Sequence, residues 1–152
     1  WERLDFSICA KKVFDAVEDI GVEKGLTFYT HFEPNVFVMG DYTALYSLVQ
    51  NLIDNAIKYT EAPGDIKIDV KDDGDWVVFS VSDTGIGIPL SEQKNIFNDF
   101  YRVGDEMTRS TKGSGLGLAT VKRVAETHKA TISLVSKPGK GSTFTVKFKK
   151  AE

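Results

Sequence analysis

The sequence predicts an α/β (α+β) two-layer sandwich, with a mixed, mostly antiparallel sheet of about five strands packed on three helices. Two observations support this fold class. Three segments of the 152-residue chain carry apolar side chains at helical spacing, and several short segments alternate apolar and polar residues as strands do. These segments do not follow a regular strand–helix–strand alternation, so the helices are expected to cover one face of the sheet.

The first half of the chain is expected to contain two helices and two short strands. Apolar residues at helical spacing predict helices over Lys11–Lys24 and Tyr42–Tyr59. Asp41 is a candidate N-cap for the second helix, because its carboxylate can accept the free amide hydrogens of the first turn. Short strands are expected over Leu26–Phe32 and Val36–Met39, on either side of a turn.

A β-hairpin is predicted next, followed by a short helix and a long loop. The residues from Ile66 to Val70 and from Val77 to Val81 alternate on either side of Asp73-Gly74, which is typical of a hairpin. A short helix is expected over Ser91–Phe97, with Ser91 as its N-cap. Residues 98–114 have little periodicity and predict a long loop, and such loops inside a compact domain are usually functional.

The remainder of the chain predicts one helix and two strands. The helix should run from Gly115 to about His128, and the strands should cover Thr131–Val135 and Thr143–Phe148. They are joined through the glycine-rich turn at residues 138–141. The chain has no internal repeat or interdomain linker, so residues 1–152 are expected to form a single domain.

Composition excludes several classes of protein. A formal net charge of -3 and a pI near 5.5 argue against a nucleic-acid partner, which usually requires a basic face. The single cysteine, Cys9, cannot form an internal disulfide and is expected to be buried. No segment has the roughly 18 apolar residues of a membrane span. Because the chain starts at Trp1 rather than Met, it is expected to be a piece of a longer protein.

Polar residues at helical spacing form the first candidate site. Asn51, Asn55 and Lys58 lie on one edge of a predicted helix, beside its apolar stripe. A carboxamide oxygen suits Mg²⁺, which takes its other ligands from phosphate and water, and a lysine can pair with phosphate. The alternative is that these amides only bond neighbouring backbone.

An aspartate and a glycine run are the other two candidates. Asp83 precedes Gly85 and Gly87, and its carboxylate could accept a hydrogen bond from an adenine amino group, although for this segment in isolation an Asp-initiated turn is the favoured interpretation. The glycines at 113, 115 and 117 precede a helix, where free amides can face phosphate, or form a hinge. Arg102 and Lys112 could add positive charge near a terminal phosphate, or simply be solvated.

Taken in order, these segments resemble the catalytic ATP-binding domain of sensor histidine kinases, within the gyrase, heat-shock-chaperone and mismatch-repair ATPase superfamily. Residues 51–59 resemble the N box of that family, residues 83–88 its G1 box, residues 96–102 its F box, and residues 113–119 its G2 box. Residues 139–144 resemble the terminal glycine motif, with Ser142 at the hydroxyl position. Two departures lie outside these motifs: Asp41-Tyr42-Thr43 stands where the family often has proline, and Lys129-Ala130 replaces its usual glycine pair.

The resemblance implies a role for each matching residue. Asn55 would be the Mg²⁺ ligand, and Asn51, Lys58 and Arg102 would contact the phosphates; these four residues form the expected catalytic set. The segment between Phe100 and Gly113 would be a long ATP lid. The residues expected to bind the nucleotide are Tyr59, Asp83, Gly85, Gly87, Ile88, Phe97, Tyr101, Lys112, Gly113, Ser114, Gly115, Leu116, Gly117, Leu118 and Ser142.

Asn51 distinguishes the competing functions. ATPases of this superfamily typically carry glutamate at this position, as a base for water, whereas an amide has no useful basicity near neutral pH. The resemblance therefore implies a histidine kinase that holds Mg-ATP for transfer to an imidazole. The alternatives are a stand-alone ATPase or chaperone-like switch, and a degenerate module that docks partners without catalysis.

The acceptor histidine is not in this sequence, because neither His31 nor His128 is followed by the family's acceptor pattern. Both histidines are expected in ordinary structural roles. The implied partners are the histidine-bearing dimerisation domain of the same kinase and a response regulator. The fragment is expected to be a cytoplasmic monomer, and the full-length protein a homodimer that in many relatives is anchored in a membrane.

Overall fold

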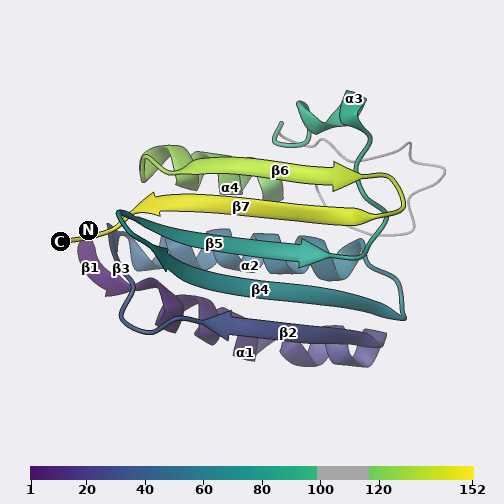
Figure 1. The fold of residues 1–152 in the computed structure, drawn as a ribbon, viewed down its shortest axis with the longest axis horizontal. Helices are drawn as coiled ribbons and strands as arrows, with labels where there is room; N and C mark the ends of the chain where they lie inside the picture. Colours follow the sequence, from purple (N-terminus) through teal and green to yellow (C-terminus); the bar gives the residue numbers. More distant parts are fainter. Residues whose placement is uncertain (99–116) are drawn as a thin grey trace.

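The computed structural model describes residues 1–98 and 117–152 and places one mixed sheet in front of a layer of helices (Figure 1). The five-stranded sheet has the order β2-β4-β5-β7-β6, and only the β2–β4 pair is parallel. Its strands are β2 (Leu26–Phe32), β4 (Gly64–Asp73), β5 (Trp76–Asp83), β6 (Thr131–Lys137) and β7 (Gly141–Lys149). The predicted fold class is confirmed.

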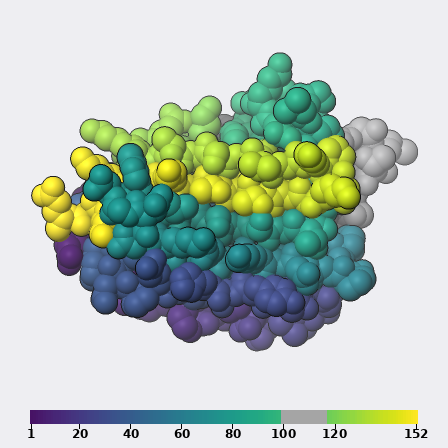
Figure 2. Space-filling model, in the orientation of Figure 1, coloured from purple at the N-terminus to yellow at the C-terminus, as the bar shows by residue number. Residues whose placement is uncertain are grey.

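Three long helices cover one face of this sheet. They are α1 (Phe6–Lys24), α2 (Tyr42–Lys58) and α4 (Gly117–Thr127), and α2 lies between the other two (Figure 1). Alternating strand residues such as Phe79, Phe144 and Val146 are fully or nearly fully buried against them. None of the helices in residues 1–98 and 117–152 covers the opposite face of the sheet, and Figure 2 shows the strands side by side on it.

The first helix begins five residues before its predicted start at Lys11, because Asp5 caps it. The Asp5 carboxylate accepts hydrogen bonds from the amides of Ser7 (2.9 Å) and Ile8 (3.4 Å). Gly25 ends the helix in a left-handed conformation, with φ at 93°. The buried Cys9 lies in the added first turns, and burial raises the pKa of its thiol to about 11.

A second, two-stranded sheet was not predicted. It pairs β1 (Glu2–Asp5) with β3 (Phe37–Gly40) in antiparallel register. The strand predicted at Val36–Met39 therefore exists, shifted by one residue, but it belongs to this small sheet. Its partner β1 has only four residues, which is too short for a periodicity signal.

The predicted N-cap of α2 is correct in position, but the predicted side-chain bond is absent. Asp41 occupies the cap position of α2, but its side chain makes no capping hydrogen bond. Its backbone amide donates instead to Nε2 of His128 at 3.1 Å. Because Nε2 accepts, Nδ1 of His128 carries the proton and donates to the Val124 carbonyl oxygen at 2.8 Å, which ties the end of α4 to the start of α2. His128 thus has the structural role that was expected.

The helix predicted over Ser91–Phe97 is shorter than expected. Helix α3 (Leu90–Gln93) follows Pro89, and Ser91 lies inside its first turn, so the predicted cap at Ser91 is wrong. The hairpin between β4 and β5 turns at Gly74 and Asp75, one residue later than expected. The predicted long loop and the start of the helix at Gly115 lie outside the described residues, apart from Asn98.

Candidate functional site

Asp83 lies at the end of β5, where three distant segments of the chain meet. Its Oδ1 atom accepts hydrogen bonds from the amides of Gly85 (2.9 Å) and Ser142 (3.2 Å). Both bonds use the same carboxylate oxygen, so Oδ2 accepts no hydrogen bond from the residues that the structure describes. One oxygen is therefore held by the fold, and the other remains available to a donor such as an amino group on a ligand.

Burial raises the pKa of the Asp83 carboxyl, while the amides of Gly85 and Ser142 act to lower it. The raised pKa shows that desolvation outweighs the two hydrogen bonds. An incoming hydrogen-bond donor stabilises a carboxylate in such an environment more than it stabilises an exposed carboxylate. This electrostatic situation is typical of ligand-binding positions, and the role expected for Asp83 remains a prediction.

Two glycines after Asp83 are required by contacts within the protein. A Cβ atom on Gly85 would lie 2.3 Å from the carbonyl oxygen of Tyr59, and one on Gly87 would lie 2.0 Å from that of Lys137. Gly87 also has φ at 74°, which favours glycine. The glycines let this loop pack against the end of α2 and the β6–β7 turn.

A chain of hydroxyl groups supports the same loop from β6 and β7. The hydroxyls of Ser136 and Ser142 lie 2.8 Å apart, and the Ile88 amide donates to Ser136 Oγ at 2.7 Å. Ser142 is buried, and Ile88 is 7% exposed. Ser142 therefore braces the loop through its hydroxyl and braces Asp83 through its amide, while the Ile88 side chain packs mainly inward.

Asn51 has a fixed orientation on α2. Its Nδ2 atom donates to the carbonyl oxygen of Ser47 (2.8 Å) and to the Ser47 hydroxyl (3.2 Å). Because a carbonyl oxygen only accepts, the amide nitrogen must face Ser47, and Oδ1 faces the start of α4. A Cβ on Gly117 would lie 3.0 Å from that oxygen. In this arrangement Asn51 offers an oxygen that is suited to a cation or a water.

Asn55, Lys58 and Tyr59 continue along the same helix and are all half-buried. The Asn55 side chain makes no hydrogen bond to the residues that the structure describes. Its oxygen is therefore free for a ligand, and one protein oxygen is enough for Mg²⁺ when phosphates and water complete the shell, so the donor set fits this ion. The Tyr59 carbonyl accepts from the Ile86 amide at 3.2 Å, which joins the end of α2 to the loop after Asp83.

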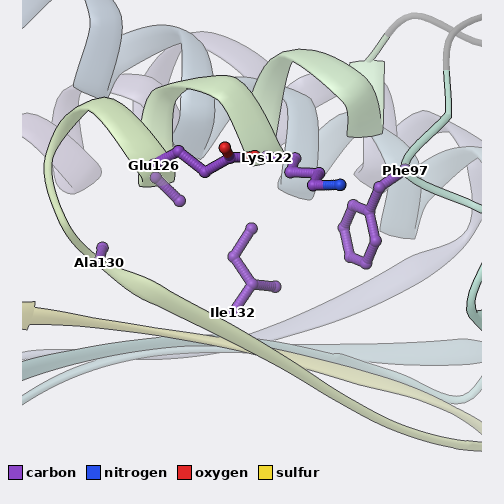
Figure 3. Close-up of a pocket in the computed structure, with 6 residues that line it drawn as sticks. Phe97, Lys122, Glu126, Ala130 and Ile132 are labelled. Carbon is purple, nitrogen blue, oxygen red and sulfur yellow. The ribbon is translucent and has the colours of Figure 1, made fainter.

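Phe97 packs against the sheet. Its ring meets that of Phe144 edge-on, with centroids 6.2 Å apart. It also lines a cavity of about 370 Å³ between α4 and β6, together with Lys122, Glu126 and Ile132 (Figure 3). These contacts favour core packing for Phe97. Its expected part in nucleotide binding remains a prediction.

The other expected site residues fall into two groups. Leu118, in the first turn of α4, is half-buried and packs against the core. Seven expected residues lie outside the described residues: Arg102, Tyr101, Lys112, Gly113, Ser114, Gly115 and Leu116.

Sequence reasoning missed Thr60. This residue is fully buried where α2 ends, and its hydroxyl is the one buried side-chain oxygen or nitrogen without a hydrogen-bond partner in the part of the chain that the structure describes. It lies 3.0 Å from the position of a Cβ on Gly85, close to Asp83. Only its place directly after Tyr59 could have drawn attention to it. Ser136 was missed for a similar reason, because one serine in a strand carries no pattern.

The comparisons with known proteins agree with this geometry. Residues 40–152 match the family described as "Histidine kinase-, DNA gyrase B-, and HSP90-like ATPase". The chain belongs to this family.

Among curated relatives, the sensor histidine kinase RcsC of Escherichia coli is 41% identical over 128 residues, which are 83% of this chain and 13% of RcsC. The mycobacterial sensor histidine kinase MprB superposes with a TM-score of 0.84 at 24% identity, covering 98% of both chains. The full-length ShkA structure in complex with AMPPNP gives a TM-score of 0.82 at 28% identity, covering 99% of this chain and 31% of that one.

These findings confirm the resemblance to the catalytic domain of sensor histidine kinases. The chain spans only a small part of its curated relatives, 13% of RcsC and 24% of RppB from Synechocystis. Within residues 1–98 and 117–152, none of the helices has the length and apolar character needed to cross a membrane.

Proposed function

We propose that this chain binds Mg-ATP and donates its γ-phosphoryl group to a histidine on a separate dimerisation domain, in two-component signal transduction. The observation that carries the proposal is the carboxamide at position 51. The Asn51 side chain is held by Ser47, to whose carbonyl and hydroxyl oxygens its amide nitrogen donates. It cannot take a proton from water, so it does not supply the base that hydrolysis would need.

Transfer to histidine needs no such base. A neutral imidazole nitrogen already has a free electron pair, which forms the nitrogen–phosphorus bond as the bond from phosphorus to the bridging oxygen breaks. ADP leaves with that electron pair. The role of this chain is then to hold the donor in line and to offset the negative charge, which is how phosphoryl transfer is mainly catalysed.

The candidate site residues divide that task among them. Asp83 accepts the adenine amino group through Oδ2, which discriminates against guanine because guanine presents a carbonyl there. Lys58 and, beyond the described residues, Arg102 pair with phosphate oxygens. Asn55 would hold Mg²⁺, the Asn51 oxygen would be available to the ion or to one of its waters, and the bound ion would neutralise phosphate charge. The AMPPNP complex of ShkA supports a nucleotide at this site.

Calorimetric titration with a non-hydrolysable ATP analogue, with and without Mg²⁺, tests the proposal. The parent chain should bind the analogue and should bind the GTP analogue much more weakly. Asn55→Ala should lose most of the metal dependence, and Gln50→Ala, an exposed change on the same helix, should bind as the parent does. Asp83→Ala should abolish the preference for adenine.

Two results would contradict the proposal. Absence of binding by the parent would exclude a nucleotide site. Sustained phosphate release from Mg-ATP, abolished in Asn51→Ala, would instead indicate a stand-alone ATPase.

The proposed partners are the dimerisation domain of the same protein and a response regulator. The isolated chain should be a monomer, which light scattering would show.

A further inference from the structure

Lys24, at the end of α1, contacts the end of the helix that carries the candidate site. Its Nζ atom donates to the carbonyl oxygens of Ile57 (2.8 Å) and Lys58 (3.1 Å), which are 33 and 34 residues further along the chain. The Lys24 side chain is 29% exposed, and the Glu61 carboxylate lies 3.9 Å from Nζ. The ammonium group is therefore engaged mainly by the backbone of α2.

These two carbonyls belong to the last turn of α2, where helix carbonyls lack partners within the helix. An ammonium group there satisfies their hydrogen bonding and meets the negative end of the helix dipole. The left-handed conformation of Gly25 ends α1 directly after Lys24. Lys24 is therefore the last residue of α1, and its side chain reaches the end of α2 from this position. The contact thus joins two helix ends with a charged hydrogen-bonding group.

The segment that Lys24 holds is part of the site. Lys58 and Tyr59 occupy the end of α2, and the Tyr59 carbonyl in turn accepts the amide of Ile86 at 3.2 Å. Gly85 packs so closely on Tyr59 that it has no room for a Cβ. A shift of the α2 terminus would therefore move Lys58 and Tyr59 and also disturb the loop that follows Asp83.

We propose that Lys24 is a positioning residue for the nucleotide site, which fixes the last turn of α2 so that Lys58 and Tyr59 meet the nucleotide. The proposal rests on the proposed function. Lys24 itself touches neither the nucleotide nor the metal. It acts through two backbone carbonyls, so side-chain substitutions at Ile57 or Lys58 would not remove the contact.

Lys24→Met tests this, because methionine keeps the apolar stem and removes the donors. With the Mg-bound ATP analogue, Lys24→Met should weaken binding about tenfold, the scale expected for losing hydrogen bonds to a charged group. Lys24→Arg should restore most of the affinity. Lys11→Met, which removes an exposed ion pair with Asp15 on the same helix, should leave affinity unchanged.

A double-mutant cycle separates positioning from a general loss of stability. If Lys24 acts in part by placing Lys58, then Lys24→Met should cost less affinity in a Lys58→Met background than in the parent, so the two losses should be less than additive. A general loss of stability would reduce affinity equally in both backgrounds. Thermal unfolding would confirm that each variant is folded at the titration temperature. If Lys24→Met does not fold, Lys24→Gln takes its place in the same cycle.

Unchanged affinity in Lys24→Met, or fully additive losses, would overturn the inference while leaving the proposed function intact. Absence of binding by the parent chain would overturn both.

Discussion

The carboxylate of Asp83 accepts a hydrogen bond from the amide of Ser142 at 3.2 Å, although 59 residues separate them. The bond spans paired strands, because Asp83 and Ser142 are register partners between β5 and β7. The same oxygen accepts the Gly85 amide. Burial nevertheless keeps the pKa of this carboxyl above its usual range, so the ionised form is less stable in the folded protein than in the unfolded chain.

Asp83→Asn should therefore stabilise the fold near neutral pH while removing adenine recognition. The folded state holds the Asp83 proton more tightly than the unfolded state, so stability falls as the pH rises from the ordinary carboxyl pKa through the raised one, and the ionised carboxylate carries the full cost above it. The asparagine variant lacks this cost. Urea unfolding at several pH values should show its advantage at neutral pH, shrinking as the pH falls to the ordinary carboxyl range.

The control for this prediction is Asp19→Asn, an exposed substitution on α1. It should change stability little across the same pH range. A lower free energy of unfolding for Asp83→Asn at neutral pH would show that the two amide bonds outweigh desolvation.

Gly87→Ala should be much more damaging than Gly74→Ala. Both glycines have positive φ, 74° and 68°, so both substitutions carry the left-handed backbone cost of about 1 kcal/mol. A Cβ on Gly74 meets nothing within 4 Å, whereas one on Gly87 lies 2.0 Å from the Lys137 carbonyl oxygen. The clash should add roughly 1–3 kcal/mol, measured by chemical denaturation. Equal losses would show that the loop moves freely.

Lys129→Gly should stabilise the chain. Lys129 has φ at 55° after the end of α4, and its amide bonds to the Glu126 carbonyl (3.0 Å) while that of Ala130 bonds to Ala125 (2.8 Å). This pair of bonds is a Schellman motif, which favours glycine at the left-handed position. The expected gain is about 1 kcal/mol in the free energy of unfolding.

Lys129→Ala is the matched control for that change, since it removes the same side chain but keeps the backbone cost. It should leave stability near that of the parent. If alanine stabilised as much as glycine, the lysine side chain and not its φ would be responsible.

Thr60→Val should also stabilise the fold, by about 1 kcal/mol, because it replaces a buried hydroxyl without a partner by a methyl group of similar shape. Ser7→Ala provides the contrast. The buried Ser7 hydroxyl donates to the Glu33 carbonyl, so its removal should destabilise. Thermal unfolding of both variants measures the difference. Destabilisation by Thr60→Val would indicate that the threonine hydroxyl has a bonding partner in solution.

The order of elements and the fold class could be predicted from periodicity, because helices and strands bury one face at spacings of 3.6 and 2 residues. The predicted helix from Tyr42 agreed within one residue with α2, which ends at Lys58. The failures were at ends and in short elements. Asp41 lies at the cap position of α2 but makes no side-chain capping bond, and its backbone amide donates to the ring of His128, directly after α4. A local pattern cannot reveal a partner 87 residues away.

The sequence by itself determined the chemistry that the chain can offer: a carboxamide at Asn51, where a base would be needed for hydrolysis, and a carboxylate at Asp83. These depend on residue type and order. Only the tertiary structure decided which atoms remain available. Packing places Ser142 against one oxygen of Asp83 and Lys24 against the end of α2. Both contacts join residues far apart in the chain, and such contacts are formed only when the helices and strands pack together.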